Sequence, residues 1–238
     1  MALIEEWEKT GQKLFRYRGQ LPVIFLVIEL LFLYFHPYRE DPWFFYRSLG
    51  YLLVSLSGFL VRIQTIAHAG EHTSGRNREK QVADSLNTSG WYSMVRHPLY
   101  LGNFLMWLGL VLFTENAWFI IFFCLIYWLY YERIMFTEEA FLRKKFGEKY
   151  LKWSENTPPF LPRFRNFRKA DTPFNTRRVL RAEYHILLEI PGGFLIMNIV
   201  RNYNIYDVFR PDRFWVWLFA GCALLWIIFR IRFKLFKK

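Results

Sequence analysis

Two short segments of this sequence bring together side chains that can bind an anion or transfer a proton. The first segment reads YSMVRHPLYLG, and its candidate residues are Tyr92, Arg96, His97 and Tyr100. Pro98 suits the first turn of a helix, where its missing N–H is not needed. The N–H groups of such a helix start, beside Arg96 and His97, predict a site for an anionic group. The alternative is that these residues only anchor the helix at an interface.

The second segment reads YERIMFTEEAFL and contains Arg133, Glu138 and Glu139. It follows an apolar stretch directly, and its helical pattern continues beyond it, so these charges are expected just outside the lipid. An arginine close to carboxylates at the edge of a membrane span indicates a functional site, because charged groups are costly there. If an amine were the substrate, Glu138, Glu139 or His97 would be the candidate base. The alternative is an amphipathic helix with solvated charges.

The elements that must position these residues are apolar blocks. The sequence is 53% hydrophobic and 21% aromatic, which excludes a disordered chain, and its two cysteines exclude a disulfide scaffold. A membrane span needs roughly 20 residues, and several of the six apolar blocks reach this length only with their flanking aromatic and basic residues. The six blocks are 21–35, 43–67, 99–113, 117–131, 184–200 and 214–229. We therefore expect an all-α, polytopic transmembrane bundle with about six spans. A soluble helical protein would have too little polar surface.

The distribution of basic residues predicts the orientation of the bundle. With six spans, 27 of the 32 Lys and Arg residues fall on the side that holds both termini. This asymmetry indicates cytoplasmic termini in a multi-pass inner or cytoplasmic membrane protein with a cytoplasmic active site. Contact with anionic lipid headgroups accounts for the net charge of +12, so no nucleic-acid partner is expected.

Three regions are expected along the chain. Residues 1–83 would form an N-terminal interfacial helix, two spans and a cytoplasmic loop. Residues 84–164 would form a core with a helical hairpin and a cofactor pocket, and residues 165–238 a linker and two spans. The core holds both of the segments that can do chemistry.

The ordered motifs of this core resemble the isoprenylcysteine carboxyl methyltransferases and the related phospholipid methyltransferases, which are integral-membrane enzymes. The similarity covers residues 84–164, about a third of the chain. It rests on the following motifs in this order: Arg96-His97-Pro98-Leu99-Tyr100-Leu101-Gly102, the hairpin 99–131, Arg133-Ile134, Glu138-Glu139, Phe146-Gly147-Glu148-Lys149-Tyr150, and Pro159-Phe160-Leu161-Pro162.

The resemblance implies an S-adenosylmethionine-dependent methyltransferase with a cofactor pocket on the cytoplasmic side. It implies that Arg133, together with Arg96, holds an anionic acceptor and that Glu139 assists as a catalytic group. The residues that the resemblance assigns to the cofactor are Leu86, Asn87, Tyr92, His97, Pro98, Leu99, Tyr100, Gly102 and Glu138.

The acceptor is expected to be a membrane lipid or a lipidated chain. The stretch 84–87 departs from the His-Thr-Leu-like segment of the prenyl-cysteine enzymes, and two further spans follow the core. We therefore expect methylation of an anionic group, either the phosphate of a lipid such as lipid A or a carboxylate. The alternatives are a prenyl-cysteine carboxyl methyltransferase, a phospholipid N-methyltransferase, a lipid transporter or lipid-binding protein, and an NADPH-dependent reductase that uses Arg76, Arg78 and Lys80. The oligomeric state stays open.

Overall fold

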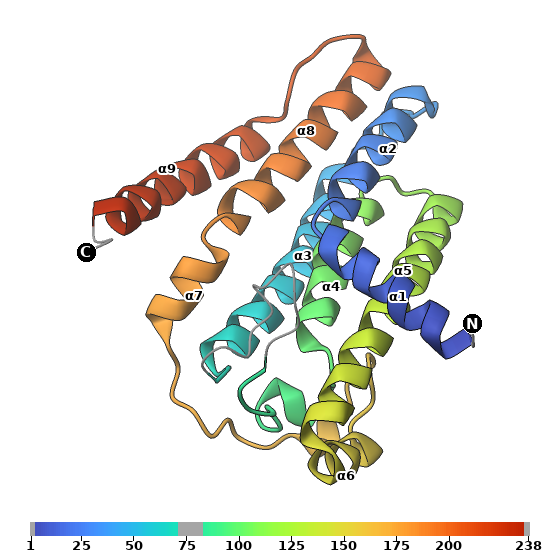
Figure 1. Ribbon diagram of the computed structural model, residues 1–238. Helices are drawn as coiled ribbons and strands as arrows, with labels where there is room; N and C mark the ends of the chain where they lie inside the picture. Colours follow the sequence, from blue (N-terminus) through green and yellow to red (C-terminus); the bar gives the residue numbers. More distant parts are fainter. Residues whose placement is uncertain (1–2, 71–82, 236–238) are drawn as a thin grey trace.

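The computed structural model describes residues 3–70 and 83–235, which form nine α-helices and two short 3₁₀ helices (Figure 1). These residues contain no β-strand, and the predicted all-α class is confirmed for them. Arg76, Arg78 and Lys80 lie outside the described residues. The elements are α1 (Leu3–Tyr17), α2 (Leu21–Phe35), α3 (Phe44–Ala67), η1 (Trp91–Ser93), α4 (Pro98–Leu112), α5 (Ala117–Phe146), α6 (Glu148–Asn156), η2 (Phe164–Asn166), α7 (Thr176–Glu183), α8 (Ile186–Tyr206) and α9 (Arg213–Leu235).

Helices α3 and α4 approach closely because glycines stand where their backbones meet. A Cβ atom on Gly58 would collide with the carbonyl oxygen of Gly102, and a Cβ atom on Gly109 would collide with Ser55. The Ser55 hydroxyl donates a hydrogen bond of 2.7 Å to the Met106 carbonyl, which satisfies a buried polar group inside the helix pair. This contact joins the middle of α3 to the middle of α4.

Helix α5 follows α4 after a short turn and completes the helical hairpin that the sequence predicts. The Asn116 side chain caps α5 by accepting a 3.0 Å hydrogen bond from the Phe119 N–H. The helix then runs for 30 residues without interruption and ends at Gly147, whose φ is +52°. Because a left-handed φ favours glycine, this residue is a natural end for the helix. Glu138 and Glu139 therefore lie on the same rigid helix as the apolar part of the hairpin.

Helix α1 lies across α5 (Figure 1), where Gly11 packs against the Thr137 side chain and the Arg133 carbonyl. The Tyr130 hydroxyl donates a 2.8 Å hydrogen bond to the Leu14 carbonyl and joins the same two helices. The side of α5 that carries Tyr130, Arg133 and Thr137 is thus covered by α1.

Length and composition identify fewer candidate spans among the described residues than the six that the sequence predicts, and the span count itself stays a prediction. Three helices among the described residues are long and apolar enough to cross a membrane: α3, α5 and α9. A fourth span results if α1 and α2, which meet at a bend of 72°, count as one. Helix α4 has 15 residues, or about 22 Å, against a hydrocarbon core of about 30 Å. Helix α8 carries polar residues and Pro191 within its length.

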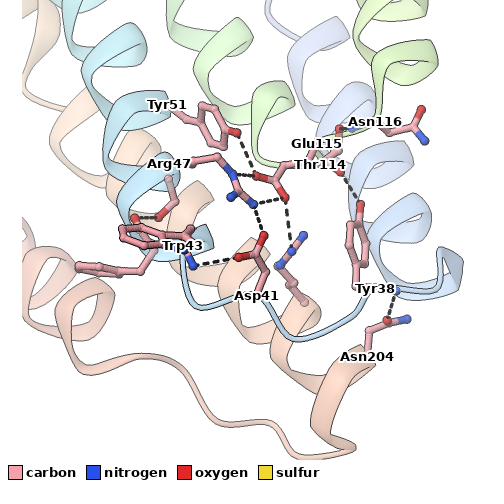
Figure 2. Close-up of polar contacts among 12 residues, drawn as sticks. Tyr38, Asp41, Trp43, Arg47, Tyr51, Thr114, Glu115, Asn116 and Asn204 are labelled. Atoms are coloured by element: carbon pink, nitrogen blue, oxygen red, sulfur yellow. Dashed lines mark hydrogen bonds and ion pairs between the residues drawn. The ribbon is translucent and has the colours of Figure 1, made fainter.

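Figure 2 shows a polar network at the end of the bundle opposite the start of α4. Arg47 Nε donates to Glu115 Oε1 at 2.5 Å, and Arg47 Nη2 donates to Asp41 Oδ2 at 2.6 Å. Tyr51 also donates to Glu115 at 3.0 Å, and the buried Arg201 of α8 lies 3.5 Å from the same carboxylate. The network ties α8 to the α3–α4–α5 core at this end of the bundle.

Candidate active site

Helix α4 begins at Pro98, as the sequence predicts, with His97 directly before its first turn. The His97 carbonyl accepts the N–H groups of Tyr100 and Leu101, both at 3.1 Å. Leu99 is partly buried and packs against the small hydrophobic cluster that includes the end of α3. The motif therefore forms a tightly bonded helix start.

The N–H groups beside this helix start are already hydrogen-bonded within the chain. Arg96 N donates to the Pro158 carbonyl at 2.8 Å, and His97 N donates to the Pro159 carbonyl at 3.2 Å. The anion site expected at the first-turn N–H groups of α4 itself stays a prediction, and of these groups Tyr100 N donates to the His97 carbonyl at 3.1 Å. The proline-rich segment that the sequence shows only as a helix exit instead holds the motif in place.

The side chains of the motif meet the glutamate pair of α5. Arg96 Nη1 donates to Glu139 Oε2 at 2.6 Å, and His97 Nε2 lies 3.0 Å from Glu139 Oε1. The Tyr100 hydroxyl donates to Glu138 Oε1 at 2.7 Å. Five predicted site residues from two distant segments thus form one cluster. The Glu138 and Glu139 side chains remain 22% and 24% exposed, so their carboxylates are within reach of a ligand.

The cluster changes the protonation of its histidine. Burial lowers the pKa of His97, but the hydrogen bonds and negative charges of Glu138 and Glu139 outweigh burial and raise the pKa above its ordinary 6.5. The two carboxylates therefore favour the protonated imidazole, and its contacts with them join the start of α4 to α5.

Aromatic residues form a wall beside the cluster. Leu86 is buried with Tyr150 and Trp153, and Tyr92 packs against them. Trp153 Nε1 donates to the Tyr92 carbonyl at 3.0 Å, which fixes η1 against α6. Burial and the Glu138 charge raise the pKa of Tyr92, while the positive charge of Arg62 lowers it, so the phenol stays neutral.

Asn87 and Arg133 lie at the margin of this arrangement. The Asn87 side chain accepts a 3.3 Å hydrogen bond from Gly70 N, so it joins its loop to the end of α3. The Arg133 guanidinium lies 4.1 Å from the centre of the Trp7 ring of α1. It therefore faces the α1 side of α5, whereas Glu138 faces Tyr100 of α4. The structure does not bring Arg133 to the cluster.

A second polar group lies inside the bundle, and sequence reasoning assigned it no function. Arg62 Nε and Nη2 donate to the two oxygens of Glu183 at 2.7 and 2.6 Å. Arg62 Nη1 donates to Asn103 Oδ1 at 2.6 Å. The sequence does show an arginine inside the apolar block 43–67. A charged side chain is costly at such a position unless it is paired, so a buried partner could have been expected. Its partner Glu183 could not be inferred, because it lies 121 residues away.

Comparisons with known proteins find relatives for the part of the chain that carries this cluster. The family model described as phospholipid methyltransferase matches residues 45–149, which include α3, α4 and α5. The chain is 32% identical over 116 residues to the protein-S-isoprenylcysteine O-methyltransferase of Schizosaccharomyces pombe, covering 48% of each protein. It is 30% identical over 117 residues to the Homo sapiens protein of the same name, covering 46% of this chain and 41% of that protein.

A further relative carries a different name. The cobalt-zinc-cadmium resistance protein CzcN of Cupriavidus metallidurans is 32% identical over 152 residues, covering 63% of this chain and 64% of that protein. No group of three or more His, Cys, Asp or Glu side chains that could hold a metal ion occurs in the described part of the chain.

The relatives are matched over only part of their length, and no solved structure matches the chain. The chain spans about half of the Schizosaccharomyces pombe enzyme and just under two thirds of the Cupriavidus protein. Residues 45–149, which the family model matches, nevertheless contain the whole cluster formed by the α4 motif and the glutamate pair. Through this part the chain is similar to the phospholipid methyltransferases and to the protein-S-isoprenylcysteine O-methyltransferases.

Proposed function

We propose that this protein transfers a methyl group from S-adenosylmethionine to an anionic group of a membrane-embedded lipid acceptor. The observation that carries the proposal is the cluster in which Arg96, His97 and Tyr100 bind the Glu138-Glu139 pair. Relatives named protein-S-isoprenylcysteine O-methyltransferase support the same chemistry. Neither a transporter nor a lipid-binding protein needs this combination of a motif and a carboxylate pair.

The residues present suit the proposed cofactor. Glu138 and Glu139 can accept hydrogen bonds from ribose hydroxyls or from an ammonium group, and both carboxylates are partly exposed. Tyr92 and Tyr100 offer aromatic faces that can attract a sulfonium cation. Arg96 Nε is buried and has no hydrogen-bond partner within the described residues, so it is a donor that a ligand can satisfy.

The bound cofactor would supply a methyl group that is attached to a good leaving group. An ionised oxygen can attack this methyl group without help from a general base. The protein then has to orient the acceptor and exclude water. Arg96 is held by Glu139, and its guanidinium is 18% exposed, so it is fixed close to the site. His97 Nε2 lies 3.0 Å from Glu139 Oε1, so this histidine would position the carboxylate, and attack by an ionised oxygen requires no proton acceptor.

A lipid phosphate, such as that of lipid A, and a lipidated carboxylate both fit this proposal. Both are ionised at neutral pH, and both can bind arginine by paired hydrogen bonds. An amine acceptor would first have to lose a proton to a base such as Glu138, Glu139 or His97, whereas an ionised oxygen needs no base. We therefore favour an oxyanion over the amine of a phospholipid headgroup.

The first test is calorimetric binding of S-adenosylmethionine, with NADPH in parallel, to the detergent-purified protein. We expect S-adenosylmethionine to bind in the micromolar to millimolar range usual for enzyme substrates and NADPH not to bind. Transfer of radiolabelled methyl to lipid phosphates and prenyl-cysteines would then identify the acceptor. Binding of NADPH alone would contradict the proposal, and binding of neither would favour transport.

A further inference from the structure

Arg62 is buried inside the bundle, in the part of α3 that packs against the α4 motif. Its side chain is 16% exposed, and that of its partner Glu183 is 3% exposed. Its guanidinium donates two hydrogen bonds to Glu183 of α7 and a third to Asn103 of α4. Three helices therefore hold the guanidinium in one orientation, which removes most of the entropy cost of ordering it for a ligand.

The α4 motif itself leaves room for Arg62. A Cβ atom on Gly102 would lie 2.5 Å from Arg62 Cγ and 2.8 Å from the Gly58 carbonyl oxygen. Only a residue without a Cβ atom allows the arginine stem to cross α4 at this position. The glycine that ends the Arg96–Gly102 motif is thus a steric requirement of Arg62, which joins this arginine to the candidate active site.

Arg62 lies against the first turns of α4, where it contacts Gly102 and binds Asn103. The same part of α4 carries Tyr100, whose hydroxyl donates to Glu138, the glutamate that is proposed to bind the cofactor. Arg133, in contrast, lies over Trp7 of α1.

The guanidinium of Arg62 retains donors for a ligand. Arginine has five N–H donors, and the bonds to Glu183 and Asn103 use three of them. The paired Glu183 also reduces the net charge of the site. An arginine in this state can orient an oxyanion by hydrogen bonds without neutralising it, which leaves the oxygen nucleophilic.

We propose that Arg62 binds the anionic group of the lipid acceptor and that Glu183 is the residue that positions it. The proposal rests on the proposed methyl transfer and names the acceptor-binding residue of that reaction. Glu183 lies outside the matched residues 45–149, so the C-terminal part of the chain takes part in acceptor binding.

The test compares a charged acceptor with an uncharged counterpart in the full-length protein in nanodiscs. The two pairs of probes are N-acetyl-S-farnesylcysteine with its carboxamide, and phosphatidic acid with diacylglycerol. Each is measured by equilibrium binding, and S-adenosylmethionine affinity is measured separately. For at least one pair we expect wild-type protein to prefer the charged probe by about 10- to 100-fold. Arg62→Gln should lose this preference and keep its cofactor affinity.

Further variants separate a binding role from a structural one. Arg62→Lys keeps the charge without the planar fork and should retain part of the preference, and Glu183→Gln should reduce it through Arg62. The matched control Arg47→Gln removes an arginine from the opposite end of α3 and should retain the full preference. Tested in parallel, Arg133→Gln represents the competing assignment.

The outcomes distinguish the two proposals. The role of Arg62 would be overturned if Arg62→Gln kept the preference for the charged probe, or if only Arg133→Gln lost it. Either result would leave the proposed methyl transfer unaffected. Wild-type protein that prefers neither charged probe would overturn the role of Arg62 as well. Absence of S-adenosylmethionine binding to wild-type protein would instead overturn the proposed function, and this inference with it.

Discussion

At the scale of single residues, the candidate site depends on which oxygen each side chain contacts. Tyr100 binds Glu138, whereas Arg96 and His97 bind Glu139. The two neighbouring glutamates therefore differ in role. Glu139 accepts from Arg96 and lies 3.0 Å from His97 Nε2, whereas Glu138 accepts from the Tyr100 hydroxyl and lies 3.5 Å from His97 Nδ1. Because no arginine binds Glu138 among these contacts, it is the better candidate for cofactor binding.

Replacement of Glu138 by Gln tests this assignment. We expect Glu138→Gln to weaken S-adenosylmethionine binding by about 1–3 kcal/mol, because a charged acceptor is exchanged for a neutral amide. Isothermal titration calorimetry measures the change. Glu148→Gln, at an exposed position of α6, is the matched control and should bind as wild type does. Equal affinity of Glu138→Gln and wild type would remove Glu138 from the site.

The raised pKa of His97 predicts a pH-dependent contribution to stability. Because the folded-state pKa lies above 6.5, this contribution is present in full below about pH 6.5 and is lost as the pH rises through the folded-state value. We expect the melting temperature of wild type to exceed that of His97→Gln most at about pH 6, with the gap narrowing towards pH 9.

His185→Gln is the control for this measurement, because His185 is 48% exposed and lies 3.8 Å from an exposed glutamate. Its effect on the melting temperature should stay small throughout. A gap between wild type and His97→Gln that does not change with pH would mean that the ionised pair makes no contribution to stability.

At the scale of elements, glycines set the separation of α3 and α4. Gly58, Gly102 and Gly109 stand at their contact, where an added Cβ atom would meet the facing backbone or a side chain of the other helix. The sequence identified Gly102 as part of a motif, but it did not show that these glycines lie where the two helices pack.

Gly102→Ala should destabilise the protein by about 1–3 kcal/mol, as overpacking of a tight contact usually does. It should also displace Arg62 and lower acceptor binding. Thermal unfolding in detergent measures the stability change. Gly50→Ala is the control on α3, because nothing lies within 4 Å of the added Cβ, and it should be neutral or slightly stabilising. Wild-type stability of Gly102→Ala would show that α3 and α4 can separate without cost.

At the scale of the whole molecule, the two ends of the bundle have different compositions. One end carries the α4 motif, α6 and the basic segment after it, and the other carries the network of Asp41, Arg47 and Glu115 (Figures 1 and 2). We propose that the first end is cytoplasmic, because 27 of 32 basic residues fall on the side with the termini in the expected topology. The division at residues 83 and 164 stays a prediction.

Labelling of single cysteines tests this orientation. In a background without Cys124 and Cys222, Arg210→Cys should react with a membrane-impermeant maleimide in intact cells. Lys169→Cys should react only after permeabilisation, because it would lie in the cytoplasm. Both positions are exposed in the structure, so side-chain burial does not limit the reaction. Labelling of Lys169→Cys in intact cells would reverse the proposed topology.

Local features of the sequence were enough to predict the all-α class, the helix start at Pro98 and the hairpin that follows it. These depend on proline geometry and on apolar runs, which act over a few residues. The number of spans stays a prediction, because apolar blocks alone do not show where a helix is too short or too polar to cross lipid.

The tertiary structure alone decided which charged groups meet. It paired Arg62 with Glu183 across 121 residues, and it directed Arg133 towards Trp7 of α1. It also occupied the N–H groups of Arg96 and His97 with proline carbonyls. Such contacts depend on how whole helices pack, and a buried charge accepts whichever partner that packing provides. Spacing along the chain carries no information about that choice.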